Sequence, residues 1–261
     1  MSRLYCINID DGIGGLTMAA TSLGPWLTPR EILNEASAER HCYDAHSLEL
    51  LIQTARYISE FLTQPHPALG RPGAVCPFAA GGLLRDTIAL TASSLREPDR
   101  NALIGSVTSL LDLFGDSETA ARSADEVYRA VVIVFPNLPD DSAATLIEHV
   151  QKELKPSFVA SGLMIGEFFP GCASPGLHSA DFRPMDTSFS SLAIRRMTIS
   201  DLPFMMDDDR FISSYLRNFD LEGRKRLSSL LLQEKIAPGR QDTIRQLLGS
   251  VDRPVLAGQS W

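Results

Sequence analysis

The sequence contains no apolar run long enough to cross a membrane. A spanning helix needs about 20 consecutive apolar residues, whereas the longest stretches here are the length of a strand, such as residues 130–135 (AVVIVF). Near the N-terminus a single Arg3 is followed by Asp10 and Asp11, where the apolar region of a secretory signal would lie. We therefore expect a cytoplasmic protein that does not associate with membranes.

Cysteine and basic charge are also scarce. The chain has four cysteines in 261 residues and none in a C-x-x-C pair, which favours reduced thiols over a disulfide scaffold or a structural zinc site. The net charge of −8 opposes binding to nucleic acid, which needs clustered lysine and arginine. The phosphate-loop, G-x-G-x-x-G and G-x-S-x-G patterns are missing too, so the common nucleotide-binding and serine-hydrolase motifs are not indicated.

The composition is that of a globular protein, with 44% hydrophobic and 21% charged residues. Hydrophobic periodicity and capping residues predict helices alternating with strands. The predicted helices cover residues 28–40, 44–63, 99–114 and 139–154, and the predicted strands cover 4–9, 86–91, 126–135, 162–169 and 190–198. We predict an α/β fold, with α+β as the alternative, in which helices flank a central mixed sheet of about four to six strands.

We predict one domain over residues 1–261, and no internal repeat is evident. Its parts would be a helical segment (1–64), a sheet core (65–200) and a helical C-terminal tail (201–261) that packs on the core. The tail is predicted to contain helices at 211–219, 221–236 and 243–251. The strand, helix and strand over 128–169 fit either a βαβ crossover or a split, ferredoxin-like unit.

A first loop rich in proline and glycine covers residues 65–78 and carries His66, Arg71 and Cys76. Four prolines stiffen its backbone, and a rigid loop that presents polar groups is typical of a binding site. Each residue also has a purely structural interpretation. His66 could cap the preceding helix, Arg71 could be a solvated charge, and Cys76 could be an inert buried thiol.

A second such loop covers residues 168–186 and follows a predicted buried strand, which is where open α/β sheets place ligands. It offers His178 as a base or metal ligand, Asp181 as an acid and Arg183 as an anion clamp. We take His178 and Asp181 as candidate catalytic residues. The alternatives are a single structural hydrogen bond for His178 and an Asx-turn for Asp181.

Two adjacent arginines, Arg195 and Arg196, lie on the last predicted strand. Because successive strand residues point to opposite faces, the two side chains are expected on different sides of the sheet. We expect one of them to face the site.

Three segments together resemble an uncharacterised family of bacterial proteins common in actinomycetes. They are H-P-x-L-G-R-x-G-x-V-C-P-F at 66–78, the strand at 162–168 with D-F-R-P at 181–184, and A-I-R-R-M through D-L-P-F at 193–204. The resemblance covers about residues 60–210. V-C-P-F at 75–78 is also distantly similar to the YqcI/YcgG family, some members of which look like haem-dependent N-hydroxylases acting on amino acids in natural-product pathways.

The second resemblance implies haem b, with His178 or, alternatively, Cys76 as the metal ligand. It also implies that haem-binding residues would come from the set Cys76, His66, Arg71, Arg183, Arg195 and Arg196. The chain departs from that family at the end of its later strand, where Phe169 and not a histidine precedes Pro170. His178 is then the nearest substitute.

Two functions of different class follow, and the first is an oxidative tailoring enzyme of bacterial secondary metabolism. It would be a haem-dependent oxidoreductase or monooxygenase acting on a small amino-acid-like or carboxylate metabolite. The second is a cofactor-free protein that binds or transforms a small anionic metabolite, with Arg71 and Arg183 as clamps and His178 as acid or base. The residues favour an enzyme without deciding the matter. A non-catalytic partner protein and a homodimer stay open.

Overall fold

The structure is a computed structural model that describes residues 22–114 and 125–250. The chain divides into two compact units, residues 1–196 and 197–261. The predicted strand at 4–9 lies outside the described residues.

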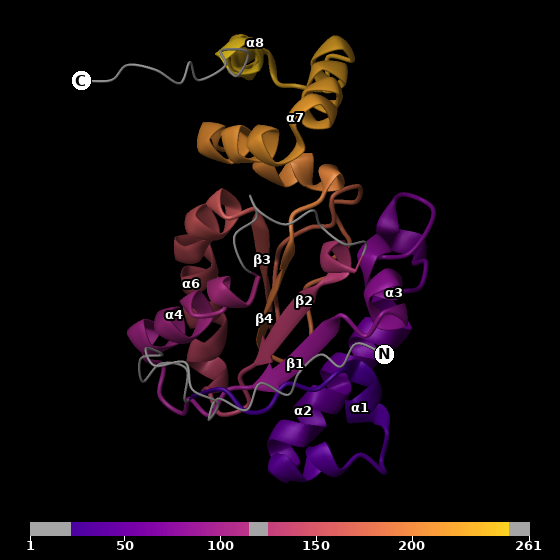
Figure 1. Ribbon diagram of the computed structural model, residues 1–261, viewed down its shortest axis with the longest axis vertical. Coiled ribbons are helices and arrows are strands. Elements are labelled where there is room, and N and C mark those ends of the chain that lie inside the picture. The colour runs from indigo at the N-terminus through magenta and orange to yellow at the C-terminus, as the bar shows by residue number, and fades with distance from the viewer. Residues whose placement is uncertain (1–21, 115–124, 251–261) are drawn as a thin grey trace, which may run out of the picture. The chain divides into compact units, whose positions relative to one another are not determined.

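A four-stranded sheet forms the centre of the first unit (Figure 1). Its strands are β1 (Ile88–Ala92), β2 (Ala130–Val134), β3 (Leu163–Phe168) and β4 (Ser191–Arg196), in the order β1-β2-β4-β3. The β1/β2 pair is parallel, whereas β4 is antiparallel to both of its neighbours. The sheet is therefore mixed, and the predicted α/β class is confirmed.

Helices connect the strands by two crossovers. From β1 to the adjacent parallel β2 the chain passes through α4 (Arg100–Thr108), α5 (Leu111–Phe114) and η5 (Glu126–Tyr128). From β2 to β3 it passes through α6 (Asp140–Ala160), and β4 is inserted between these two strands. Of the two alternatives for residues 128–169, the split unit is the one observed.

Each face of the sheet buries its own hydrophobic cluster. One face is covered by α4, α5 and α6 (Figure 1), which bury Val131 and Ile133 of β2 with Ile194 of β4. The other face is covered by α1 (Pro29–Leu33), α2 (Ala45–Arg56) and α3 (Pro77–Leu84), which bury Leu90, Val132 and Val134. The continuous apolar run of β2 is thus explained, because a strand between two helical layers is apolar on both sides.

Several element boundaries differ from the prediction. The helix after Thr28 ends at Leu33 and not near residue 40, because Asn34 has an extended backbone and its Oδ1 accepts a hydrogen bond from the Ala36 N–H; the chain continues in η2 (Ala38–Cys42). Helix α6 continues through Pro156 to Ala160, since Phe158 and Val159 beyond the proline are fully buried. Helix α3 was not predicted.

A π-helical segment, η3 (Tyr57–Leu62), continues α2 directly, and a short 3₁₀ helix, η4 (Pro67–Leu69), follows it. π-Helices are rare and frequently occur at functional sites.

The second unit is helical, as predicted for the tail. It contains η6 (Ile199–Met205), α7 (Asp209–Leu232), η7 (Pro238–Arg240) and α8 (Gln241–Ser250). Helix α7 is interrupted at Asp220, whose φ of 35° is not helical, and the hydroxyl of the fully buried Tyr215 donates to the Ile199 carbonyl. None of the helices in the described part of the chain is long and apolar enough to span a membrane.

Candidate functional site

The π-helical segment η3 holds aromatic side chains against the second loop. The Tyr57 hydroxyl donates to the Pro184 carbonyl, and its ring meets Phe168 and Phe189 at centroid distances of 6.1 and 5.6 Å. Burial raises the pKa of the Tyr57 phenol, so the hydroxyl remains a protonated donor at neutral pH. Tyr57 thereby ties η3 to the loop that follows β3.

The first loop reaches the second through stacked rings. The His66 imidazole stacks on Phe182 with centroids 4.7 Å apart and an interplanar angle of 22°, and Phe61 lies 6.2 Å from Phe182. His66 Nδ1 accepts a hydrogen bond from the Ala68 N–H at 3.2 Å, so His66 caps the following helix η4 and not the preceding one. His66 was considered as a cap of the preceding helix, whereas the helix that it caps is the one that follows it.

The two loops also meet through their backbones at Gly70. This glycine has φ of +74°, and a Cβ placed on it would lie 2.3 Å from the carbonyl oxygen of His178. The position therefore requires glycine for its conformation and for the close approach. We call residues 66–71 and 177–183 together the loop junction.

Both predicted clamps lie at the loop junction and are held by their own loops. Arg71 donates to the carbonyls of Pro72 and Val75, at 3.0 and 3.1 Å. The exposed Arg183 donates to the carbonyls of Ala180 and Phe182. A guanidinium has five N–H groups, so these bonds orient each side chain and leave donors for a ligand.

The two candidate catalytic residues, His178 and Asp181, are both exposed. Elsewhere in the same loop, Asp186 Oδ1 accepts a hydrogen bond from the Gly171 N–H at 2.8 Å. Gly171 has φ of +78°, so Asp186 closes the left-handed turn that begins the loop. The role of Asp186 was missed, because an aspartate distant in sequence from the turn gives no local signal.

Arg195 and Arg196 lie on opposite faces of β4. The half-buried Arg195 has its guanidinium carbon 5.5 Å from the ring centroid of Phe78, at the end of the first loop. Arg196 is buried under α4–α6, where it donates to the Phe114 carbonyl and lies 3.4 Å from a Glu126 carboxylate oxygen. Arg195 is therefore the member of the pair on the side of the first loop, and Arg196 supports the fold.

The two candidate haem ligands, Cys76 and His178, lie in different surroundings. Cys76 packs against the cluster under α1–α3, whereas Cys172 is buried in the cluster under α4–α6. His178 is exposed, and the His66 imidazole stacks on Phe182 between the two loops. Among residues 22–114 and 125–250, no three His, Cys, Asp or Glu side chains come together as metal ligands.

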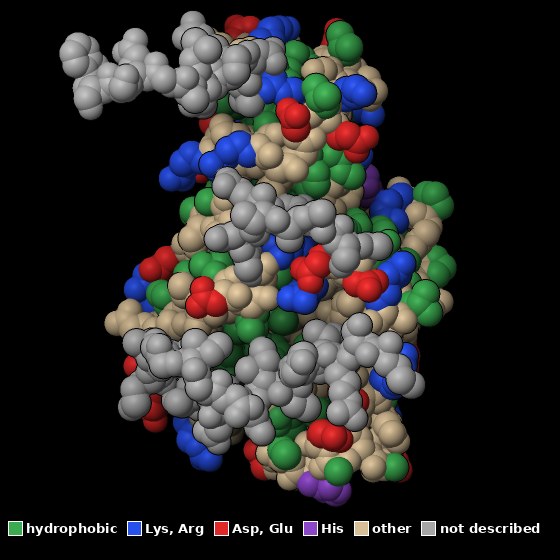
Figure 2. Space-filling model, in the orientation of Figure 1, with side chains coloured by type: hydrophobic (Ala, Val, Ile, Leu, Met, Phe, Trp, Pro, Cys, Tyr) green, Lys and Arg blue, Asp and Glu red, His purple; other side chains and the backbone are tan. Residues whose placement is uncertain are grey.

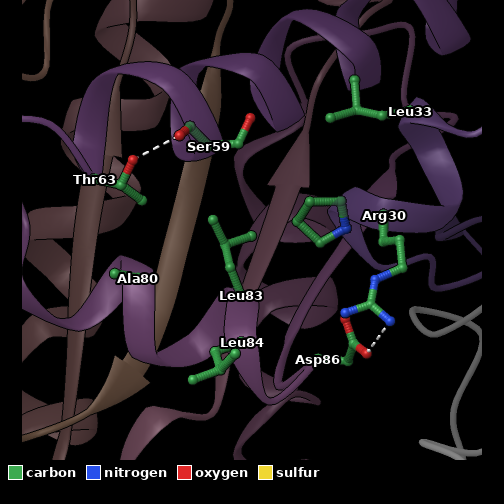
Figure 3. A pocket seen from close by; sticks show the side chains of 9 residues that line it. Arg30, Leu33, Ser59, Thr63, Ala80, Leu83, Leu84 and Asp86 are labelled. Atoms are coloured by element: carbon green, nitrogen blue, oxygen red, sulfur yellow. Dashed lines mark hydrogen bonds and ion pairs between the residues drawn. The ribbon is translucent and has the colours of Figure 1, made fainter.

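A shallow cavity of about 450 Å³, widely open to solvent, lies elsewhere, between α1, η3 and α3 (Figure 3). Its lining is mostly apolar, with the ion pair of Arg30 and Asp86, 3.1 Å apart, beside it. The lining residues are Pro29, Arg30, Leu33, Ser59, Thr63, Ala80, Leu83, Leu84 and Asp86. The sequence did not indicate this cavity, because three separate elements build it and one of them, α3, was not predicted.

Glu167 on the edge strand β3 gives a pH-dependent prediction. Burial raises the pKa of its carboxyl, and a 3.5 Å hydrogen bond from Ser174 offsets this only in part. A raised pKa means that the fold favours the protonated form. Glu167→Gln is therefore expected to increase the free energy of unfolding at pH 7, by about 0.5 kcal/mol for a half-buried group.

The pH profile of urea unfolding tests this prediction. The stabilisation by Glu167→Gln is complete above the raised pKa, shrinks as the pH falls through it, and is gone below the ordinary value near 4.3. A stabilisation that grows toward low pH would contradict the assignment. Glu153→Gln is the matched control, because Glu153 lies on α6 in an exposed ion pair with Arg100.

The face shown in Figure 2 mixes basic and acidic side chains among its coloured residues, without a continuous basic surface.

Comparison with known proteins places the chain in a family. Residues 51–229 match a domain of unknown function, DUF6875, which includes both loops and all four strands. No curated protein and no solved structure matches the chain significantly. The resemblance to an uncharacterised family is thus confirmed: the chain belongs to the DUF6875 family.

Proposed function

We propose that the loop junction binds a small metabolite that carries a carboxylate, with Arg71 and Arg183 as its cationic groups and His178 as acid or base. The observation that carries this proposal is the contact of Gly70 with the His178 carbonyl. It brings two loops that are far apart in sequence to one place.

The two arginines are brought to the junction because each one directly follows a residue that contacts the other loop. Arg71 follows Gly70, which touches His178, and Arg183 follows Phe182, which stacks on His66. Arginine is suited to this task because its planar fork binds a carboxylate through two hydrogen bonds. A ligand would lie on the solvent side of the junction, where His178 and Arg183 are exposed.

The choice of His178 as the proton-transfer group rests on its position and residue type. Histidine is the side chain best suited to exchange a proton near neutral pH. The exposed imidazole of His178 is accessible from solvent, whereas that of His66 is stacked and accepts a backbone hydrogen bond. His178 rather than His66 is therefore the acid or base of this proposal.

A thermal-shift titration tests the proposed ligand class. With two cationic groups available, the dicarboxylate succinate is a suitable probe. At a tenfold excess over its dissociation constant, it is expected to raise the melting temperature of the wild type by about 3 °C. Arg183→Gln is expected to abolish most of this shift, because it removes one guanidinium and leaves the fold intact.

Arg96→Gln is the matched control, since Arg96 is exposed in the segment after β1, outside both loops, and its loss changes the net charge equally. Equal succinate shifts in the wild type and in Arg183→Gln would refute the proposal.

Haem-dependent oxidation stays a prediction, as do the similarity to the YqcI/YcgG family, the cytoplasmic location and the homodimer. An absorbance spectrum tests the haem. A Soret band in the purified protein that His178→Ala or Cys76→Ala removes would support the haem enzyme and displace the present proposal.

A further inference from the structure

We infer that the cavity between α1, η3 and α3 is a second binding site, which takes a small amphipathic carboxylate. The alkyl or aryl part of such a ligand would lie on the apolar lining, and its carboxylate would bind Arg30. This inference is independent of the function proposed for the loop junction.

The lining accounts for the apolar part of the ligand. Leu33, Leu83 and Leu84 converge on the cavity from two helices (Figure 3). Leu84 is 78% exposed and Leu33 is 37% exposed, so large apolar side chains remain in contact with water. Covering such surface is favourable. The volume of about 450 Å³ lies within the usual range for small-molecule sites.

Arg30 accounts for the charged part. Its Nη1 lies 3.1 Å from Asp86 Oδ2, and its side chain is 70% exposed. An ion pair this exposed contributes little stability, and one contact engages only one side of the guanidinium. The remaining N–H groups form a fork that can bind a second carboxylate.

Asp86 is the acidic partner of this arginine. It follows α3 with φ of +51°, a left-handed conformation that aspartate tolerates, and its N–H donates to the Leu83 carbonyl. The carboxylate of Asp86 lies at the end of α3 and pairs with Arg30 beside the apolar lining (Figure 3).

The π-helical segment η3 forms the third wall of the cavity. Because π-helices frequently occur at functional sites, its presence favours a functional role for the cavity. Ser59 and Thr63 face the cavity from η3 and the residue after it, and their hydroxyls donate to the carbonyls of Ala55 and Ser59. Because both hydroxyl hydrogens are donated within the helix, a ligand would meet the oxygen lone pairs and the carbon atoms of these two side chains. The cationic donor of the site is therefore Arg30.

Calorimetric titration of the full chain with three octyl compounds tests the inference. Octanoate, octanol and octylamine share the chain and differ in the head group. We expect octanoate to bind at least about tenfold more tightly than octanol, as a charge-assisted bidentate contact implies. Octylamine is expected to bind no better than octanol.

Three variants separate the contributions of the head group and the chain. Arg30→Gln is expected to bring octanoate down to the affinity of octanol, and Ala80→Trp, which fills the cavity from an exposed position on α3, is expected to weaken both at least fivefold. Arg96→Gln, with an equal charge change outside the lining, is expected to leave both affinities unchanged. Octylamine binding more tightly than octanoate, or octanoate binding unaffected by both Arg30→Gln and Ala80→Trp, would overturn the inference.

Discussion

Gly70→Ala is expected to separate the two loops and to lower the free energy of unfolding by about 2–4 kcal/mol. Two costs combine at this position. The left-handed backbone, at φ of +74°, is strained for alanine, and the alanine Cβ would lie 2.3 Å from the His178 carbonyl oxygen. Backbone atoms on both sides leave no flexible side chain to move aside. Urea unfolding measures the loss.

Gly73→Ala is the matched control for this substitution. Gly73 also has a left-handed backbone, at φ of +91°, but its nearest heavy atom would be Arg71 Nη1 at 3.6 Å, an ordinary contact. This control carries the backbone cost alone, about 1 kcal/mol. The difference between the two variants measures the contact between the loops. Equal destabilisation would show that the loops are not packed at Gly70.

Arg196→Ala is expected to cost about 3 kcal/mol of stability, whereas Arg195→Ala costs about 1 kcal/mol. Arg196 is 5% exposed, and its removal leaves the buried Phe114 carbonyl without the hydrogen bond that Arg196 donates to it. Glu126 is affected less, because it keeps its 2.6 Å ion pair with Arg129. Arg195 loses chiefly its stacking on the Phe78 ring.

The two adjacent arginines serve as controls for each other, because they share a strand, a charge and a side-chain length. Urea unfolding of both variants at pH 7 decides between the roles. A larger loss for Arg195→Ala would contradict the assignment of Arg196 to the fold and of Arg195 to the side of the first loop.

Local rules predicted much of the fold. Alternating and continuous apolar runs located all four described strands, and the capping box at Thr28 marked the start of α1. The same rules failed where tertiary packing prevailed. The helix predicted to end at residue 154 continues as α6 past Pro156, where Phe158 is buried, and the glycine and proline around α3 concealed a helix.

The candidate site was predictable in its segments but not in its contacts. The density of proline, glycine and polar residues identified both loops, and strand alternation separated Arg195 from Arg196. The stack of His66 on Phe182 and the approach of Gly70 to His178 depend on residues far apart in sequence. The cavity beside Arg30 combines three helical elements, so no single segment could indicate it.

The most direct test of the loop junction as one ligand site is NMR mapping of the backbone amides during titration with succinate. The proposal predicts that amide signals of Gly70, Arg71 and Gly73 shift together with those of residues 178–183, with one dissociation constant, and that Arg183→Gln weakens the response of both loops. Shifts confined to one loop, or different dissociation constants for the two, would contradict it.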